Sequence, residues 1–427
     1  MSLPILLPRL PAQRYSCHGC GNCCRDFTVQ LRPEDLDKLE AQEWQRRLGE
    51  PVTVTFRERT YLRQRSDGAC IFLQEGGRCR IHAEYGLEAK PLACQMFPFS
   101  LAPAERGVAV GLNFACQSVL ENKGAALSSH VPDIARLAAL VPEAAPTGRP
   151  PLLTPRLRAS DAEAAALVAV LDGWMARAEV PIDVRLEGLA WLAQSLWSAR
   201  LDRVREERFV ELLSTLAMAL PDELEHLPTE PPASRHWRLL RQAVHARTED
   251  LRLAEVVRRA RWRIVLEQLR TSRRFARGRG TVPSIGDAGP NGATFAAVAQ
   301  AGAAADGADA EAVADLLTRY VRATILGGRF FGGGYYGWPL AHGVAAIALN
   351  ASATSWLSRL YAVGAGRGRI ELADVQAALG RIDRHSGRAA WLGSAGERWR
   401  LTYLVRTDGL RRMARHVPFC VGFAGWR

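Results

Sequence analysis

Eight cysteines lie between residues 17 and 116 of this 427-residue chain, and they constrain its fold more than any other feature. The segment Met1–Pro8 lacks a basic n-region, and no run of eighteen apolar residues follows, so we expect a cytoplasmic protein without membrane contact. Cytosolic thiols are kept reduced, so crowded cysteines favour a metal site over disulfides. The candidate ligands are Cys17, Cys20, Cys23, Cys24, Cys70, Cys79, Cys94 and Cys116.

The first four cysteines follow the pattern C-x2-C-x2-C-C over 17–24. Two residues between ligands let a tight loop turn its thiolates toward a common centre, and Gly19 and Gly21 permit the positive φ that this turn needs. Bacterial ferredoxins offer three cysteines with this spacing to an iron–sulfur cube, with a fourth ligand from elsewhere in the chain. Because Cys23 and Cys24 are neighbours, we expect their side chains to diverge, so that one serves beside the metal or at a second site.

The metal and the number of sites stay open at this point. Eight thiolates could fill two tetrahedral zinc sites, whereas one four-iron cluster would use four of them. We expect His82 to hydrogen-bond beside the metal and His18 to face solvent. Cys420 stands alone near the C-terminus, where we expect it to behave as a small buried apolar residue.

The patterning predicts an α+β fold, with a small cysteine-rich metal-binding domain at 1–120. Short strands are expected at 26–31, 52–63 and 108–114, and a helix from Pro33 to about Leu48. A hairpin pairing 70–73 with 78–81 would bring Cys70 and Cys79 together. Further short helices are expected after His82 and from Lys90 to Pro98.

A mainly α-helical domain is expected at 156–427, after a proline-rich linker at 121–155. Apolar residues three and four positions apart predict its helices, and a glycine- and alanine-rich stretch at 278–307 predicts a flexible loop. The expected helices are 159–178, 184–218, 237–277, 312–326, 340–363 and 371–385.

The chain has 56 basic and 44 acidic residues, and much of the excess lies in 251–280, where ten arginines accompany only Glu255 and Glu267. Helical spacing places Arg259, Arg263, Arg270, Arg274 and Arg277 on one face, and Leu253, Val257, Ala260 and Ile264 on another. A solvated basic face and a site for an acidic partner both fit this pattern. No base-stacking aromatic pattern accompanies the arginines, so nucleic acid is disfavoured as the partner.

Four motifs in order resemble the CxxCxxCC (YkgJ-like) family of zinc- or iron-chelating domains, which includes the flagellin lysine-N-methylases. They are the 17–24 pattern, Gly68–Leu73, Cys79–His82 and Lys90–Pro98, within about residues 14–118. The resemblance supports the eight cysteines as ligands. In the methylase branch it implies a four-iron (4Fe-4S) cluster and S-adenosylmethionine as methyl donor, and on this basis we expect iron–sulfur in preference to zinc. The layout of Arg319 to Tyr361 also resembles that branch, more loosely.

Two functions follow as expectations. The first is a protein whose metal centre is structural or carries electrons, with a helical docking domain. The second is a protein-lysine N-methyltransferase with a flagellin-like protein substrate. If a substrate pocket lies outside the cysteine domain, we expect it at the glycine-rich 327–334, with Tyr335, Tyr336 and Trp338 as walls; a plain turn between helices is the alternative. The sequence contains no P-loop, HExxH, G-x-S-x-G or radical S-adenosylmethionine C-x3-C-x2-C pattern.

Overall fold

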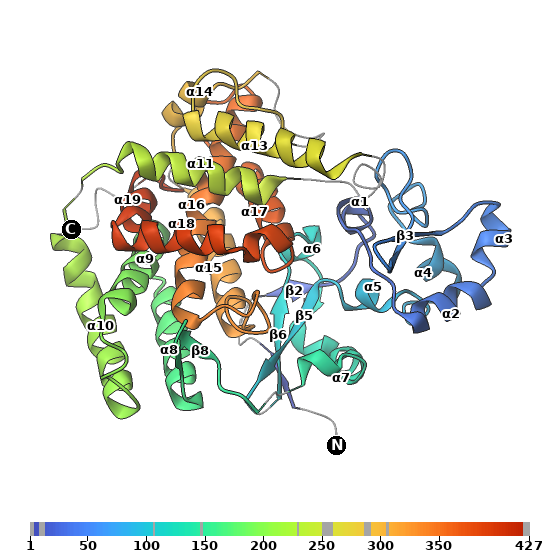
Figure 1. The fold of residues 1–427 in the computed structure, drawn as a ribbon, viewed down its shortest axis with the longest axis horizontal. Helices are drawn as coiled ribbons and strands as arrows, with labels where there is room; N and C mark the ends of the chain where they lie inside the picture. The colour runs from blue at the N-terminus through green and yellow to red at the C-terminus, as the bar shows by residue number, and fades with distance from the viewer. Residues whose placement is uncertain are drawn as a thin grey trace.

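The structure is a computed structural model, and it describes residues 4–7, 13–105, 107–145, 148–228, 230–249, 259–285, 292–304 and 307–421. It confirms the α+β class, because the strands concentrate in the N-terminal part and helices form most of the rest. Figure 1 shows a small lobe, drawn in blue, beside a larger helical body. Among these described residues, no helix combines the length and the apolar character needed to cross a membrane.

The lobe is built from short elements around a small core of its own. The buried core residues are Leu31, Leu39, Trp44, Val52, Leu62, Phe72 and Ile81. The elements are α1 (Asn22–Asp26), α2 (Pro33–Ala41), α3 (Trp44–Leu48), β3 (Thr53–Phe56), β4 (Arg59–Leu62), α4 (Arg80–Tyr85) and α5 (Leu92–Met96).

Three expected elements of the lobe differ from the structure. The strand expected at 52–63 is a hairpin of β3 and β4, because Arg57 and Glu58 adopt positive φ and reverse the chain. The helix expected from Pro33 to Leu48 is divided into α2 and α3 at Glu43, which also has positive φ. Of the strand expected at 26–31, only Gln30 makes a bridge, to Tyr61.

A three-stranded sheet joins the lobe to the body. Its order is β1 (Ile5–Leu6), β6 (Gly107–Leu112) and β5 (Phe99–Ala104), with β5 and β6 antiparallel and β1 parallel to β6. A second pair joins β2 (Arg14–Tyr15) to β7 (Ala125–Ala126). Phe99, Val110 and Leu112 belong to the large core of the helical body, so the cysteine-rich sequence is shared between two cores.

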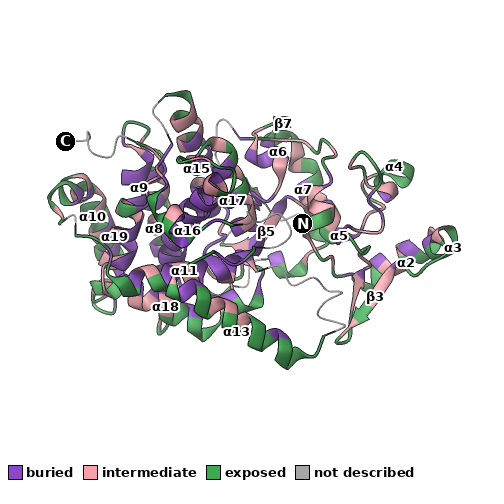
Figure 2. Cartoon of the chain, turned by 90° about the horizontal axis from the view of Figure 1, so that it is seen from above, coloured by how far each residue is buried: buried purple, intermediate pink, exposed green. Residues whose placement is uncertain are grey.

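The body surrounds α16 (Leu340–Gly364), whose residues are almost all buried (Figure 2). A helix that is apolar on every side belongs in the centre of a domain. The other helices of the body are α6 (Gln117–Leu120), α7 (Val131–Ala139), α8 (Asp161–Met175), α9 (Ile182–Ser198), α10 (Glu207–His226), α11 (Ser234–Thr248), α13 (Arg261–Arg277), α14 (Phe295–Gln300), α15 (Ala308–Leu326), α17 (Leu372–His385), α18 (Ala395–Arg406) and α19 (Gly409–His416).

The segments expected as linker and loop contain packed residues. Within 121–155 lie α7 and β8 (Leu152–Thr154), and Leu153 is fully buried in the large core. Within 278–307, residues Phe295–Gln300 form α14. Val282, Phe295 and Val298 are large apolar residues scattered among the glycines and alanines of this stretch, and all three are buried. Residues 286–291 and 305–306 of that stretch, and Leu253 and Val257 before it, lie outside the described residues.

Candidate metal centre

The 17–24 loop lies directly against the turn between Cys70 and Cys79. Gly19 and Gly21 have φ of +72° and +75°, the positive values that the sequence predicts. A Cβ on Gly77 would lie 2.1 Å from the Gly19 carbonyl oxygen and 2.9 Å from the Cys20 carbonyl carbon. Glycine at position 77 therefore allows a backbone-to-backbone approach that no side chain would permit.

The predicted hairpin brings two of the separated cysteines to the same place. Leu73 pairs with Cys79, and the Arg80 N–H donates to the Phe72 carbonyl at 2.8 Å. The Cys70 N–H donates to the Cys24 carbonyl at 2.7 Å, which ties the hairpin to α1. We call Cys70, Cys79 and Cys94 the hairpin group, because all three pack against the small core of the lobe.

Cys17, Cys20 and Cys116 form a second set, which we call the sheet group. The Ser118 hydroxyl donates to the Ser16 carbonyl at 2.6 Å, so the residue before Cys17 is fixed to the start of α6. Cys116 is the residue that precedes α6, and it packs against the large core. Within the sheet group, Cys116 is thus held by the body, whereas the hairpin group is held by the lobe.

Tyr15 lies among the thiols of the sheet group. Burial raises the pKa of its hydroxyl well above the ordinary value, and negative charge on Cys116, Cys17, Cys23 and Cys20 adds to the effect. Burial likewise raises the pKa of Cys116 to about 12, with smaller contributions from Cys23 and Cys20. These couplings indicate that the four thiols share one neighbourhood.

Lys90 lies among the thiols of the hairpin group. Burial alone would lower the pKa of its ammonium, but negative charge on Cys94, Cys79, Cys23 and Cys24 outweighs burial and raises it. Burial raises the pKa of Cys70 to about 11 and that of Cys94 still further. Sequence reasoning alone assigned neither Lys90 nor Tyr15 a role at the site. Their signals were position: Tyr15 stands two residues before Cys17, and Lys90 opens the Lys90–Pro98 motif four residues before Cys94.

Cys23 and Cys24 stand at the junction of the two groups. A hydrogen bond with the Cys24 thiol, together with burial, raises the pKa of Cys23 far above its usual range. The pair lies in α1, where successive residues are separated by about 100° around the axis and not by the 180° of a strand. The two side chains therefore leave α1 about 100° apart, and the hydrogen bond keeps their thiols near each other.

The eight thiols are gathered but not arranged in a finished coordination sphere. In the described part of the chain, no three His, Cys, Asp or Glu side chains form a group that could hold an ion as they stand. All nine cysteines are described, and none is in a disulfide. Cys420 lies apart in the body, where its N–H donates to Asp183 at 2.9 Å. His18 and His82 are both exposed.

The glycine-rich stretch 327–334 is a packed turn. A Cβ on Gly327 would lie 2.4 Å from the Gly111 Cα, so glycine lets this turn lie directly on β6. Tyr335 and Trp338 are buried, and their rings contact each other at 5.4 Å between centroids. The expected aromatic walls thus belong to the core.

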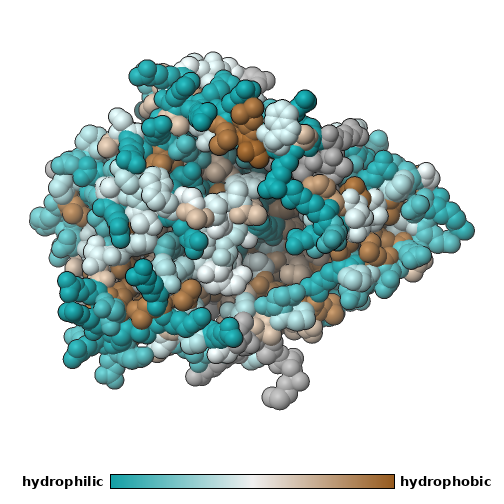
Figure 3. Space-filling view, in the orientation of Figure 1, coloured by the Kyte–Doolittle hydropathy of each residue, from teal (hydrophilic) through white to brown (hydrophobic). Residues whose placement is uncertain are grey.

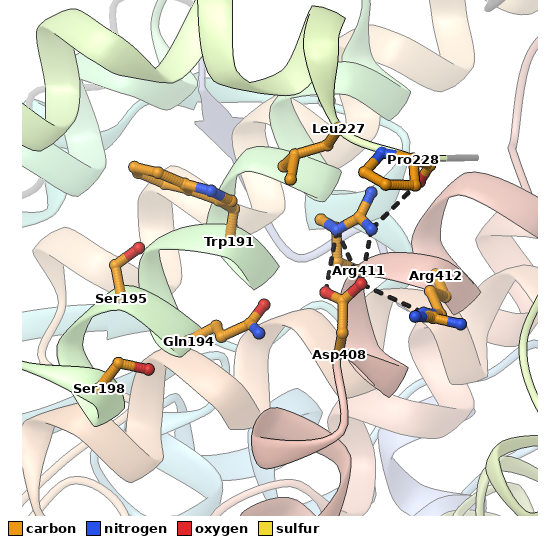
Figure 4. A pocket seen from close by; sticks show the side chains of 9 residues that line it. All are labelled: Trp191, Gln194, Ser195, Ser198, Leu227, Pro228, Asp408, Arg411 and Arg412. Atoms are coloured by element: carbon orange, nitrogen blue, oxygen red, sulfur yellow. Dashed lines mark hydrogen bonds and ion pairs between the residues drawn. The ribbon is translucent and has the colours of Figure 1, made fainter. Parts of the chain in front are cut away.

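A surface pocket of about 330 Å³ is found elsewhere, between α9 and α19 (Figure 4). Its floor is closed by Arg411, which donates to Asp408 and to Glu187. The lining residues are Trp191, Gln194, Ser195, Ser198, Leu227, Pro228, Asp408, Arg411 and Arg412, with no cysteine among them.

Comparison with known proteins agrees with the cysteine geometry. Residues 16–120 match the CxxCxxCC family, described as "Putative zinc- or iron-chelating domain". An uncharacterized protein of Methanocaldococcus jannaschii is 33% identical over 86 residues, which are 20% of this chain and 29% of that protein's length. No solved structure matches the chain. The chain therefore carries a cysteine-cluster domain of the zinc- or iron-chelating type, and the comparisons leave the helical body unassigned.

Proposed function

We propose that the cysteine-cluster domain holds an iron–sulfur centre and that the helical body is its docking domain, with a structural or electron-carrying role for the centre. The observation that carries the proposal is the gathering of thiols from five separate stretches of chain into two adjoining groups. Thiolates are the ligands that iron–sulfur clusters and structural zinc prefer, so the donor set fits either metal.

The two groups suggest how the ligands would be divided. The sheet group and the hairpin group each contribute three thiols, and the junction pair Cys23 and Cys24 could complete each set to four. Four thiolates are what a four-iron cluster or a tetrahedral zinc site requires. When bound, an iron–sulfur cluster would exchange single electrons, whereas zinc would only stabilise the fold.

Metal and sulfide analysis of the full chain, purified without oxygen, tests the proposal. We expect brown protein with iron and acid-labile sulfide in nearly equal amounts. Colourless protein with bound zinc would contradict the iron–sulfur assignment and keep the metal site. Protein with neither metal would contradict both.

A protein-lysine N-methyltransferase is the second candidate, and it is supported by the resemblance of the four cysteine motifs to the methylase branch. In that case the protein substrate would dock beside the cysteines, and S-adenosylmethionine would bind as methyl donor. Isothermal titration of the metal-loaded protein with S-adenosylmethionine separates the candidates. Tight binding favours the methyltransferase, and no detectable binding leaves the structural or electron-carrying role.

A further inference from the structure

Helix α13 carries an apolar stripe that no other described part of the chain covers. Its members are Trp262, Val265, Leu266 and Leu269, and the side chains of Trp262 and Leu269 are 64% and 50% exposed. Their spacing of three, four and seven places them on one face of the helix. Figure 3 shows an apolar patch on the surface where Figure 1 places α13. We call these four residues the α13 stripe.

A row of arginines borders the α13 stripe on the side away from the body. Its members are Arg263, Arg270, Arg273, Arg274 and Arg277, all exposed. Within the described residues none of them has an ion-pair partner, and Glu267, the one acidic residue of α13, pairs with Arg259. The arginine row therefore presents several positive charges without acidic partners next to the α13 stripe.

The C-terminal end of α13 is anchored to the body. Arg241 of α11 donates to the carbonyls of Phe275 and Ala276 at 2.8 and 3.0 Å, and His245 stacks on the Phe275 ring. Ile264 and Phe275 face inward and are buried. Figures 1 and 2 both show the other end of α13 directed toward the lobe that carries the cysteines.

The α13 stripe and its arginine row favour one kind of binding partner over the others. A second copy of this chain would bring two arginine rows together, which charge repulsion opposes. A flat membrane is disfavoured because the arginines border only one edge of the stripe, while the body occupies the other edge. Nucleic acid would leave the aliphatic side chains without a partner. A protein helix with an apolar face and acidic flanks would cover the stripe and neutralise the arginines together.

We propose that the α13 stripe and its arginine row dock an acidic amphipathic helix of a partner protein. This inference names the partner class of the docking role in the proposed function. Docking here would place the partner beside the cysteine groups, while the contact itself needs no metal.

The test uses a fluorescent helical peptide of leucine, alanine and glutamate, with its leucines spaced three, four and seven apart. Fluorescence anisotropy measures its Kd for the full, metal-loaded chain. The double variant Leu266→Asp/Leu269→Asp should weaken binding at least about tenfold, or about 1.4 kcal/mol. Arg270→Glu/Arg274→Glu should have a similar effect, and one that is smaller at high salt.

Matched controls separate the α13 surface from general effects. Met218→Asp and Arg208→Glu change exposed residues of α10 and should leave the Kd unchanged. A peptide with the same composition in shuffled order should bind weakly. The iron and zinc content of every variant should equal that of the wild type, so a loss of docking is distinguished from a loss of the metal centre.

Four results would overturn the proposal. The first is equal peptide affinity for wild type and both α13 variants. The second is binding to phosphatidylserine vesicles, but not to the peptide, in co-sedimentation. The third is binding to single-stranded DNA but not to the peptide. The fourth is dimerisation in sedimentation velocity that the Leu266→Asp/Leu269→Asp variant abolishes, because a second copy would then be the occupant.

Discussion

Arg329 forms a buried ion pair with Asp383, with 3.1 Å between Nη2 and Oδ1. Asp383 also accepts the Phe114 N–H at 2.6 Å, and Arg329 donates to the Leu112 carbonyl. Two charged side chains of the helical body therefore fix the end of β6, from which the chain continues to Cys116. The position of one candidate ligand thus depends on residues more than two hundred positions later.

Breaking this pair should destabilise the protein strongly. Asp383→Asn leaves the Arg329 guanidinium buried without its counter-charge, and we expect a loss of about 3 to 5 kcal/mol in urea unfolding. Glu179→Gln removes an exposed partner of Arg177 and should leave the free energy of unfolding nearly unchanged. Similar losses in the two variants would contradict the role given to the buried pair.

Two adjacent glycines offer a matched test of how the 17–24 loop is positioned. Gly76 and Gly77 both have φ of +82°, but an added Cβ meets nothing at Gly76 and meets the Gly19 and Cys20 backbone at Gly77. Both alanine variants carry the left-handed backbone strain, roughly 1 to 2 kcal/mol. Only Gly77→Ala should also lower the bound metal per chain, measured by plasma mass spectrometry. Equal metal content in both variants would argue against the contact.

Substitution of a single thiol tests the ligand assignment. Cys20→Ser should lower the bound metal and destabilise the first 118 residues, because a hydroxyl is a poor ligand for a soft metal. Cys420→Ser should do neither, since Cys420 lies in the body away from both groups. Metal content and thermal unfolding of the two variants check this, and identical behaviour would contradict it.

Removal of the metal should loosen the lobe and spare the body. The small core of the lobe is a cluster of seven buried apolar residues, and the thiolates of the lobe repel one another without a cation between them. Limited proteolysis after chelation, followed by mass spectrometry, should show new cleavage between residues 17 and 97. Unchanged cleavage rates there would show that the lobe folds without metal.

Glu163 should make the stability of the body depend on pH in acid. Its hydrogen bonds with Arg205, assisted by the Glu206 and Ser160 N–H groups, lower its pKa from 4.5 to about 2. A pKa that is lower in the folded state contributes stability above pH 4.5, which is lost as the pH falls toward 2. Glu163→Gln should therefore be about 3 kcal/mol less stable at pH 7, and the difference should shrink toward pH 2. A constant difference across this range would refute the assignment.

The sequence predicted what depends on local pattern. The positive φ of Gly19 and Gly21 and the helix α16 occur as expected. The hairpin expected between 70–73 and 78–81 is reduced to a tight turn closed by the bridge from Leu73 to Cys79, because Arg80 and Ile81 already belong to α4. The burial of Leu153 and Phe295 was not foreseen, because the prolines and glycines around them suggested open chain. The turn at Arg57 and Glu58 was missed because neither residue is a usual left-handed one.

The two-group arrangement of the cysteines could not have been predicted from spacing. It depends on contacts between distant segments, such as the Ser118 hydroxyl on the Ser16 carbonyl and the Cys70 N–H on the Cys24 carbonyl. Spacing shows which cysteines can share a loop, whereas their neighbours across the fold are set by tertiary packing. Tertiary packing between distant segments also brings Lys90 and Tyr15 close to the thiols.

The division of the thiols between two cores has a mechanical consequence. Cys116 packs against the core of the body and Cys70 against that of the lobe, while Cys23 is coupled electrostatically to both. A metal centre bound between the two groups of cysteines would cross-link the lobe to the body. Its loss would remove that cross-link.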